Sequence, residues 1–77
     1  MNLDEFIVNF VDQLNDADAS QINADTAFKN LNEWSSMSAL AVIAMIDDEY
    51  DVQIKGDDIR RAETIADLFS RVKELKG

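Results

Sequence analysis

Apolar residues recur at helical spacing in two segments, one near each end of the chain. Their positions, three or four residues apart, are Leu3, Phe6, Ile7, Phe10 and Leu14 in the first segment and Ile65, Leu68, Phe69, Val72 and Leu75 in the last. This spacing gathers apolar side chains on one face of an α-helix, whereas a half-buried strand would alternate at every second residue. No long stretch alternates in that way, and the chain has no proline. The sequence therefore predicts an all-α fold.

The pattern predicts four helices in a single domain, residues 1–77, which is long enough for one modest core. We expect the helices over residues of about 3–14, 36–50, 57–62 and 65–76. Asn2, Asp57 and Thr64 stand at the starts of the first, third and fourth, where such residues cap helices. The long loop before the second helix carries isolated apolar residues that should hold it to the core: Ile22, Phe28, Leu31 and Trp34. The prediction is a four-helix bundle with a long first loop and a short third helix.

Composition excludes several functions. Cysteine and histidine are both absent, which removes disulfides, thiolate nucleophiles, the usual zinc sites and the commonest general base. We therefore expect neither an autonomous enzyme nor a metal site. The apolar runs are interrupted well before the roughly 20 residues that a membrane helix requires, and the amino terminus lacks the basic flank of a secretory signal. These features favour a cytoplasmic protein that does not insert into membranes.

Charge narrows the choice of partner. Sixteen acidic residues against seven basic ones give a net charge of −9, and the first 28 residues contain no lysine or arginine. Nucleic acid is a poor candidate partner, because phosphate binding depends on clustered lysine and arginine. A protein partner with a basic surface fits better, although acidity also serves simply to keep a small domain soluble.

Three serines in the segment Glu33–Ser38 precede an apolar run that reaches Tyr50. Ser36 lies where the second helix should begin. The first N–H groups of a helix lack internal acceptors and carry the positive end of the helix dipole, so an anion is stabilised there. Ser36 is thus either a helix N-cap or a hydroxyl that is phosphorylated or joined to a group bearing a phosphate.

The second helix has two apolar sides. One suits the core, and the other has few charges, although the exposed side of a helix normally carries several. A side of this kind indicates a docking surface for a partner, to which methionine can adapt its shape. Surface alanines and single exposed methionines are also common without any function. The residues expected to dock a partner are Met37, Ser38, Ala41, Met45, Asp47 and Asp48.

Two motifs, together with the order of the helices, resemble the acyl carrier proteins over essentially the whole chain. The first is Trp34-Ser35-Ser36-Met37 at the start of the second helix, and the second is Asp48-Glu49-Tyr50-Asp51-Val52-Gln53-Ile54 at its end. Family members carry Asp-Ser-Leu or Asp-Ser-Met at the first motif, and the serine receives 4′-phosphopantetheine. That serine falls on Ser36, because its spacing to the second motif matches the family register. Ser35 occupies the place of the family's aspartate.

The resemblance implies a carrier of acyl or related intermediates, held as thioesters on a 4′-phosphopantetheine arm that comes from coenzyme A. Its partners would be a phosphopantetheinyl transferase and the loading, elongating or transferring enzymes of fatty acid, polyketide or peptide biosynthesis, with basic or apolar docking patches. The length favours a discrete, monomeric carrier. The cargo could also fold back between the helices, where a small core could part to admit it: Val42, Ile43, Ile46, Ile59, Ile65 and Phe69.

Two alternatives compete with this interpretation. Asp51–Gly56 has a glycine at the sixth place of a calcium-binding loop, but Gln53 replaces the usual aspartate or asparagine, and Lys55 and Ala62 stand where such a loop needs carboxylate ligands. The sequence therefore argues against calcium. The stronger alternative is an unmodified, carrier-like interaction module, which Ser35 in place of aspartate would favour.

Overall fold

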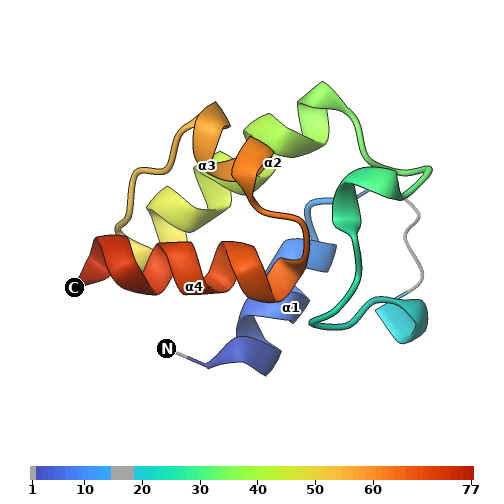
Figure 1. Cartoon of the computed structure of the whole chain (residues 1–77), viewed down its shortest axis with the longest axis horizontal. Coiled ribbons are helices and arrows are strands. Elements are labelled where there is room, and N and C mark those ends of the chain that lie inside the picture. Colours follow the sequence, from blue (N-terminus) through green and yellow to red (C-terminus); the bar gives the residue numbers. More distant parts are fainter. Residues whose placement is uncertain (1, 15–18) are drawn as a thin grey trace.

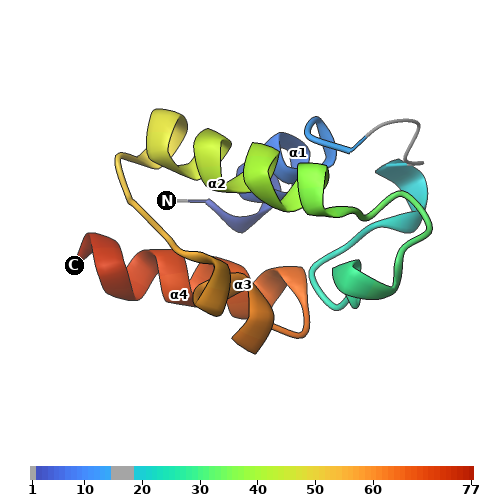
Figure 2. The same cartoon turned by 90° about the horizontal axis from the view of Figure 1, so that it is seen from above.

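The chain forms a small bundle of helices. The computed structural model describes residues 2–14 and 19–77. Within this part of the chain the α-helices are α1 (Leu3–Val11), α2 (Ser36–Tyr50), α3 (Gly56–Arg61) and α4 (Ile65–Lys76), and two short 3₁₀ helices, Ala19–Gln21 and Phe28–Asn30, lie in the long loop. In Figures 1 and 2, α2 and α4 run in the same direction along the molecule, and α3 lies in the connection between them. The predicted all-α bundle with a short third helix is confirmed.

Side-chain caps explain where three of the helices begin. Asn2 Oδ1 accepts a hydrogen bond of 3.1 Å from the N–H of Glu5 and so caps α1. Thr64 Oγ1 accepts from the N–H of Asp67, and Asp67 Oδ2 accepts from the N–H of Thr64, both at 3.1 Å, which makes a reciprocal box at the start of α4. In α3 the Asp58 carboxylate accepts from the N–H of Lys55 at 2.9 Å. This bond starts α3 at Gly56, one residue before the predicted start.

The end of α1 differs from the prediction. The helix stops at Val11 instead of continuing to residue 14. The N–H groups of Gln13 and Leu14 bond to the carbonyls three residues earlier, at 3.0 and 2.9 Å, and so form tighter turns. Leu14 is nevertheless buried. The apolar spacing therefore continues past the helix, which is why the pattern predicted a longer one.

The core is built around α1. Its two phenylalanines, Phe6 and Phe10, are fully buried and contact different aromatic neighbours. Phe6 lies 5.6 Å from Tyr50 and 5.3 Å from Phe69, ring centre to ring centre.

The apolar face of α4 is shorter than the sequence predicted, since Leu75, the last residue of the predicted stripe, is 42% exposed. The apolar face of α4 thus ends at Val72.

The described part of the long loop is held at several points. Ile22 and Phe28 are buried, and Leu31 and Trp34 pack against the core. The carbonyl of Ala24 also accepts a hydrogen bond of 2.9 Å from the N–H of Ala66 in α4. These contacts fix the path by which the chain reaches the start of α2. None of the helices in residues 2–14 and 19–77 is long and apolar enough to cross a membrane.

Candidate functional site

The start of α2 places the two adjacent serines in different roles. Ser35 has extended backbone angles, with φ −147° and ψ 175°, and is the N-cap. Ser36 is the first helical residue. The interpretation of Ser36 as an N-cap is therefore wrong, because the cap lies one residue earlier. Serine and aspartate are both preferred N-caps, so Ser35 caps α2 as an aspartate would, but without a negative charge.

Ser35 and Ser38 form a reciprocal capping box. Ser35 Oγ accepts a hydrogen bond of 3.2 Å from the N–H of Ser38, and Ser38 Oγ accepts one of 3.3 Å from the N–H of Ser35. The two hydroxyl oxygens are 3.2 Å apart. Ser38 Oγ also donates to the carbonyl of Glu33 at 3.2 Å. The network joins the end of the loop to the first turn of the helix, and each cap bond of this kind contributes roughly 1 kcal/mol.

Ser36 is exposed, and its hydroxyl has no hydrogen-bond partner among the residues that the structure describes. The N–H groups of Ser36 and Met37 stand at the first two helical positions, where no intrahelical acceptor exists. The first turn of α2 carries no acidic side chain. The positive end of the helix dipole is therefore not neutralised by a carboxylate in that turn, and a phosphate ester on Ser36 would be stabilised there.

An aromatic cluster supports the chain just before this site. The indole of Trp34 stacks on the ring of Phe10, with ring centres 5.9 Å apart and planes only 2° from parallel. Phe28 meets the same indole edge-on at 5.0 Å. Trp34 is thus tied both to α1 and to the long loop. Because it lies two residues before Ser36, this packing fixes where the serine emerges from the core.

The exposed side of α2 is rotated from the predicted one. Ser38 and Met45, both expected on the docking face, are only 7% and 6% exposed, and Ala41 is half-buried. Ser38 is drawn inward by its hydrogen bond to the loop, and Met45 belongs to the core. Besides Ser36 and Glu49, α2 presents five side chains to solvent, called here the α2 surface: Met37, Leu40, Ala44, Asp47 and Asp48.

The docking residues expected from the sequence did not include Ala44, and they did not include Leu40. Its side chain is 67% exposed, and that of Met37 is 78% exposed. The signal was present in the spacing, since Met37, Leu40, Ala44 and Asp47 follow one another at three or four residues and so share a side of the helix. The α2 surface is consequently apolar in its first half and acidic in its second.

A groove of about 370 Å³ lies beside the α2 surface. Leu40, Ile43, Ala44 and Asp47 form its wall on α2, and the wall on the segment leading to α3 is made of Gln53, Ile54 and Lys55. Ile43 is half-buried and also packs against the core. The other residues predicted to line a cavity, Val42, Ile46, Ile59, Ile65 and Phe69, are buried in that core. Ile43 therefore stands between the open groove and the buried residues.

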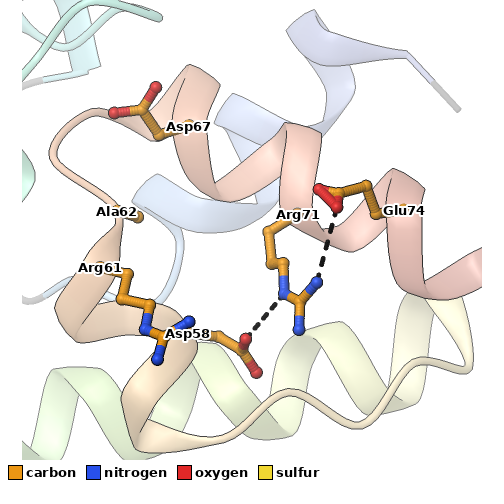
Figure 3. A pocket seen from close by; sticks show the side chains of 6 residues that line it. All are labelled: Asp58, Arg61, Ala62, Asp67, Arg71 and Glu74. Atoms are coloured by element: carbon orange, nitrogen blue, oxygen red, sulfur yellow. Dashed lines mark hydrogen bonds and ion pairs between the residues drawn. The ribbon is translucent and has the colours of Figure 1, made fainter.

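An ion pair between Asp58 and Arg71 joins α3 to α4, and a second pair lies within α4 (Figure 3). Arg71 of α4 donates from Nε to the Asp58 carboxylate at 2.8 Å, and its Nη1 lies 3.6 Å from Glu74. The N–H of Lys55 and the Arg71 guanidinium hold the pKa of Asp58 below the ordinary aspartate value. In turn, the hydrogen bond to the Asp58 carboxylate raises the pKa of the Arg71 guanidinium. These contacts fix α3, which follows directly after the groove wall.

The comparison with known proteins agrees with this geometry. A family described as "Phosphopantetheine attachment site" matches residues 5–72, which is most of the chain. The matched span contains Ser36, the α2 surface and the groove. No solved structure gives a significant match.

Proposed function

The chain belongs to the phosphopantetheine attachment site family, and from this membership we propose that it is an acyl carrier protein modified on Ser36. As a member it is a carrier and not an enzyme, it bears a covalent 4′-phosphopantetheine, and it works with a phosphopantetheinyl transferase and with client enzymes. The proposal adds the attachment residue, an acyl cargo, and action as a monomer in the cytoplasm.

The observation that carries the choice of Ser36 is its free, exposed hydroxyl at the first position of α2. A serine hydroxyl is a weak nucleophile without a base, and this chain has no histidine. The transferase must therefore supply the base. The bound arm supplies a terminal thiol, on which the cargo is held as a thioester. Ser36 holds the arm at the helix end, and the N–H groups of Ser36 and Met37 face the phosphate charge.

We propose that partners dock on the α2 surface. Met37 and Leu40 offer a partner two exposed apolar side chains close to Ser36, while Asp47 and Asp48 offer negative charge two turns beyond Leu40. A complementary partner would carry an apolar patch beside its active-site entrance and basic side chains displaced from it. Apolar burial would then supply affinity, and charge would orient the encounter.

We further propose that the cargo lies first in the groove beside Ile43 and enters the core as it lengthens. Ile43 lines the groove and also packs against the core that contains Val42 and Ile46, so the core would have to part beside Ile43 to admit the cargo. Acyl chains of increasing length should raise the melting temperature and the amide-exchange protection of α2 and α3. If neither quantity changes with chain length, the cargo stays outside the core.

Intact mass measurement tests the attachment. The apo protein is incubated with coenzyme A and a broad-specificity phosphopantetheinyl transferase, and the expected product carries one arm. Ser36→Ala should abolish the addition. Ser35→Asn should keep it, because asparagine caps a helix as well as serine does but has no hydroxyl. No addition with any transferase would support the unmodified interaction module, and loss of addition in Ser35→Asn with retention in Ser36→Ala would move the site to Ser35.

A further inference from the structure

Two adjacent serine hydroxyls are exposed at the start of α2, yet the structure makes them chemically different. Within residues 2–14 and 19–77 the Ser36 hydroxyl has no hydrogen-bond partner, whereas Ser35 contacts Ser38 through both its N–H and its hydroxyl. Resting on the proposed attachment to Ser36, we propose that the buried hydroxyl of Ser38 is a positioning group that restrains Ser35 and thereby directs modification to its neighbour.

The direction of the hydrogen bonds follows from counting protons. A serine hydroxyl has one proton to donate and two lone pairs to accept with. Ser38 Oγ donates its proton to the carbonyl of Glu33 at 3.2 Å, so toward Ser35 it can only accept. It accepts from the N–H of Ser35 at 3.3 Å, and the remaining lone pair faces the Ser35 hydroxyl at 3.2 Å. Ser35 must therefore be the donor between the two hydroxyls.

Ser35 Oγ is engaged on both sides. Its proton points to Ser38 Oγ, and one of its lone pairs accepts from the N–H of Ser38 at 3.2 Å. Because Ser38 is only 7% exposed, water has little access to replace it as a partner. The hydroxyl is thus held in the capping geometry with its proton turned away from solvent.

Transfer of the arm requires a serine hydroxyl that can release its proton, and the proton of Ser35 is held in a hydrogen bond. The serine oxygen forms a bond to phosphorus, the phosphorus–oxygen bond within the pyrophosphate of coenzyme A breaks, and adenosine 3′,5′-bisphosphate leaves with the electron pair. The serine proton passes to the base of the transferase. Ser36 can give up its proton and use a lone pair without breaking any contact in the described chain. Ser35 would first have to break the hydrogen bond that it donates to Ser38 Oγ.

The test uses the full apo chain, coenzyme A and a broad-specificity transferase, and fragment-ion mass spectrometry measures the ratio of arm on Ser35 to arm on Ser36. In the unaltered protein we expect the arm on Ser36 alone. Ser38→Ala frees the Ser35 proton and should make arm on Ser35 detectable, because the loss of one capping hydrogen bond corresponds to roughly a five- to tenfold faster reaction at Ser35. In a Ser36→Ala background, where we expect no addition, the second change Ser38→Ala should make modification of Ser35 detectable.

Matched variants separate this effect from a loss of stability. Thr64→Ala removes the equivalent reciprocal box at the start of α4, far along the chain from the serines, and should leave the ratio unchanged. Ser38→Thr keeps a hydroxyl and should restore the original ratio. If Ser38→Ala proves unfolded by circular dichroism, Ser38→Cys keeps the volume with a weaker acceptor and should shift the ratio in the same direction.

The outcomes distinguish this inference from the function on which it rests. Failure of the unaltered protein to accept an arm on any serine would overturn both. Modification of Ser36 with the same ratio in the unaltered protein, Ser38→Ala and Ser38→Cys would overturn only the positioning role of Ser38. A shift produced equally by Thr64→Ala would assign the effect to stability and would overturn that role as well.

Discussion

The carboxylate of Asp58 in α3 accepts a hydrogen bond of 2.8 Å from Arg71 Nε in α4. The same carboxylate accepts from the N–H of Lys55 at 2.9 Å, so one side chain both starts α3 and joins it to α4. A helix of six residues is too short to be stable on its own. The position of α3, and with it the adjoining groove wall at Gln53–Lys55, therefore depends on this pair.

Asp58→Ala should lower the free energy of unfolding by about 1–2 kcal/mol, because it removes a cap bond and leaves the half-buried Arg71 with only the weak contact to Glu74. Amide protection in α3 should fall more than in α4. Urea unfolding and hydrogen exchange measure the two effects. Asp57→Ala is the matched control, since Asp57 pairs only with the exposed Arg60 and such surface pairs contribute little. Equal losses in the two variants would contradict the role of Asp58.

The free energy of unfolding should depend on pH through the protonation of Asp58 and Asp67. Hydrogen bonds from the N–H groups of Thr64 and Glu63 lower the pKa of Asp67, as those from Lys55 and Arg71 lower that of Asp58. The unfolded chain therefore takes up protons at a higher pH than the folded one. The stabilisation is fully present above about pH 5 and is lost as the pH falls through the lowered folded pKa values.

This pH effect is measured as the difference in unfolding free energy between the unaltered protein and the double variant Asp58→Asn, Asp67→Asn. The difference removes the general relief of negative charge that protonation brings to a chain with a net charge of −9. We expect it to shrink steadily from pH 5 to pH 2. A difference that stays constant over this range would show that neither carboxylate has a lowered pKa.

Asp51 ends α2 in the left-handed conformation, with φ 56° and ψ 41°. Glycine adopts this conformation without steric cost, so Asp51→Gly should raise the unfolding free energy by roughly 0.5–1 kcal/mol. Asp51→Asn is the control for charge, because it removes the carboxylate from the acidic end of α2 but keeps a side chain. Thermal unfolding of the two variants should show the glycine protein to be the more stable. If asparagine stabilises as much as glycine, charge repulsion and not backbone conformation explains the gain.

Leu40 should contribute to the binding of partner enzymes and not to the stability of the fold. Leu40→Gln removes an apolar side chain that is 67% exposed, so we expect KM for the transferase to rise about three- to tenfold with an unchanged melting temperature. Val8→Gln is the matched control, since Val8 in α1 is 60% exposed and lies outside the α2 surface. A transferase that responds alike to both variants, or to neither, would show that it does not dock through Leu40.

Much of the fold could be predicted because the capping residues and the apolar residues point to the same helices and the same core. Thr64 caps α4 as expected, and Phe28 and Trp34 hold the long loop to the core. The end of α1 could not be read from spacing, since Leu14 stays buried after the helix has ended. Helix boundaries are set by hydrogen bonds that apolar periodicity does not report.

The details of the candidate site were less predictable. A shift of the helix start by one residue decides whether Ser35 or Ser36 is the N-cap, and serine is a good cap at either position. Ser38 is buried because the path of the loop brings the carbonyl of Glu33 within reach of its hydroxyl. A helical wheel divides α2 into two halves, but it does not show which neighbours cover the helix, and in the fold Met45 is buried and Leu40 is exposed.

The most direct test of the account is the state of Ser36 in protein purified from its native cells. Fragment-ion mass spectrometry should find 4′-phosphopantetheine on Ser36, and a fraction of the molecules should carry an additional acyl mass that neutral hydroxylamine removes, as it does from thioesters. The mass of that cargo would also identify the pathway. An unmodified Ser36 in every molecule, or an arm attached to any other residue, would contradict the central claim.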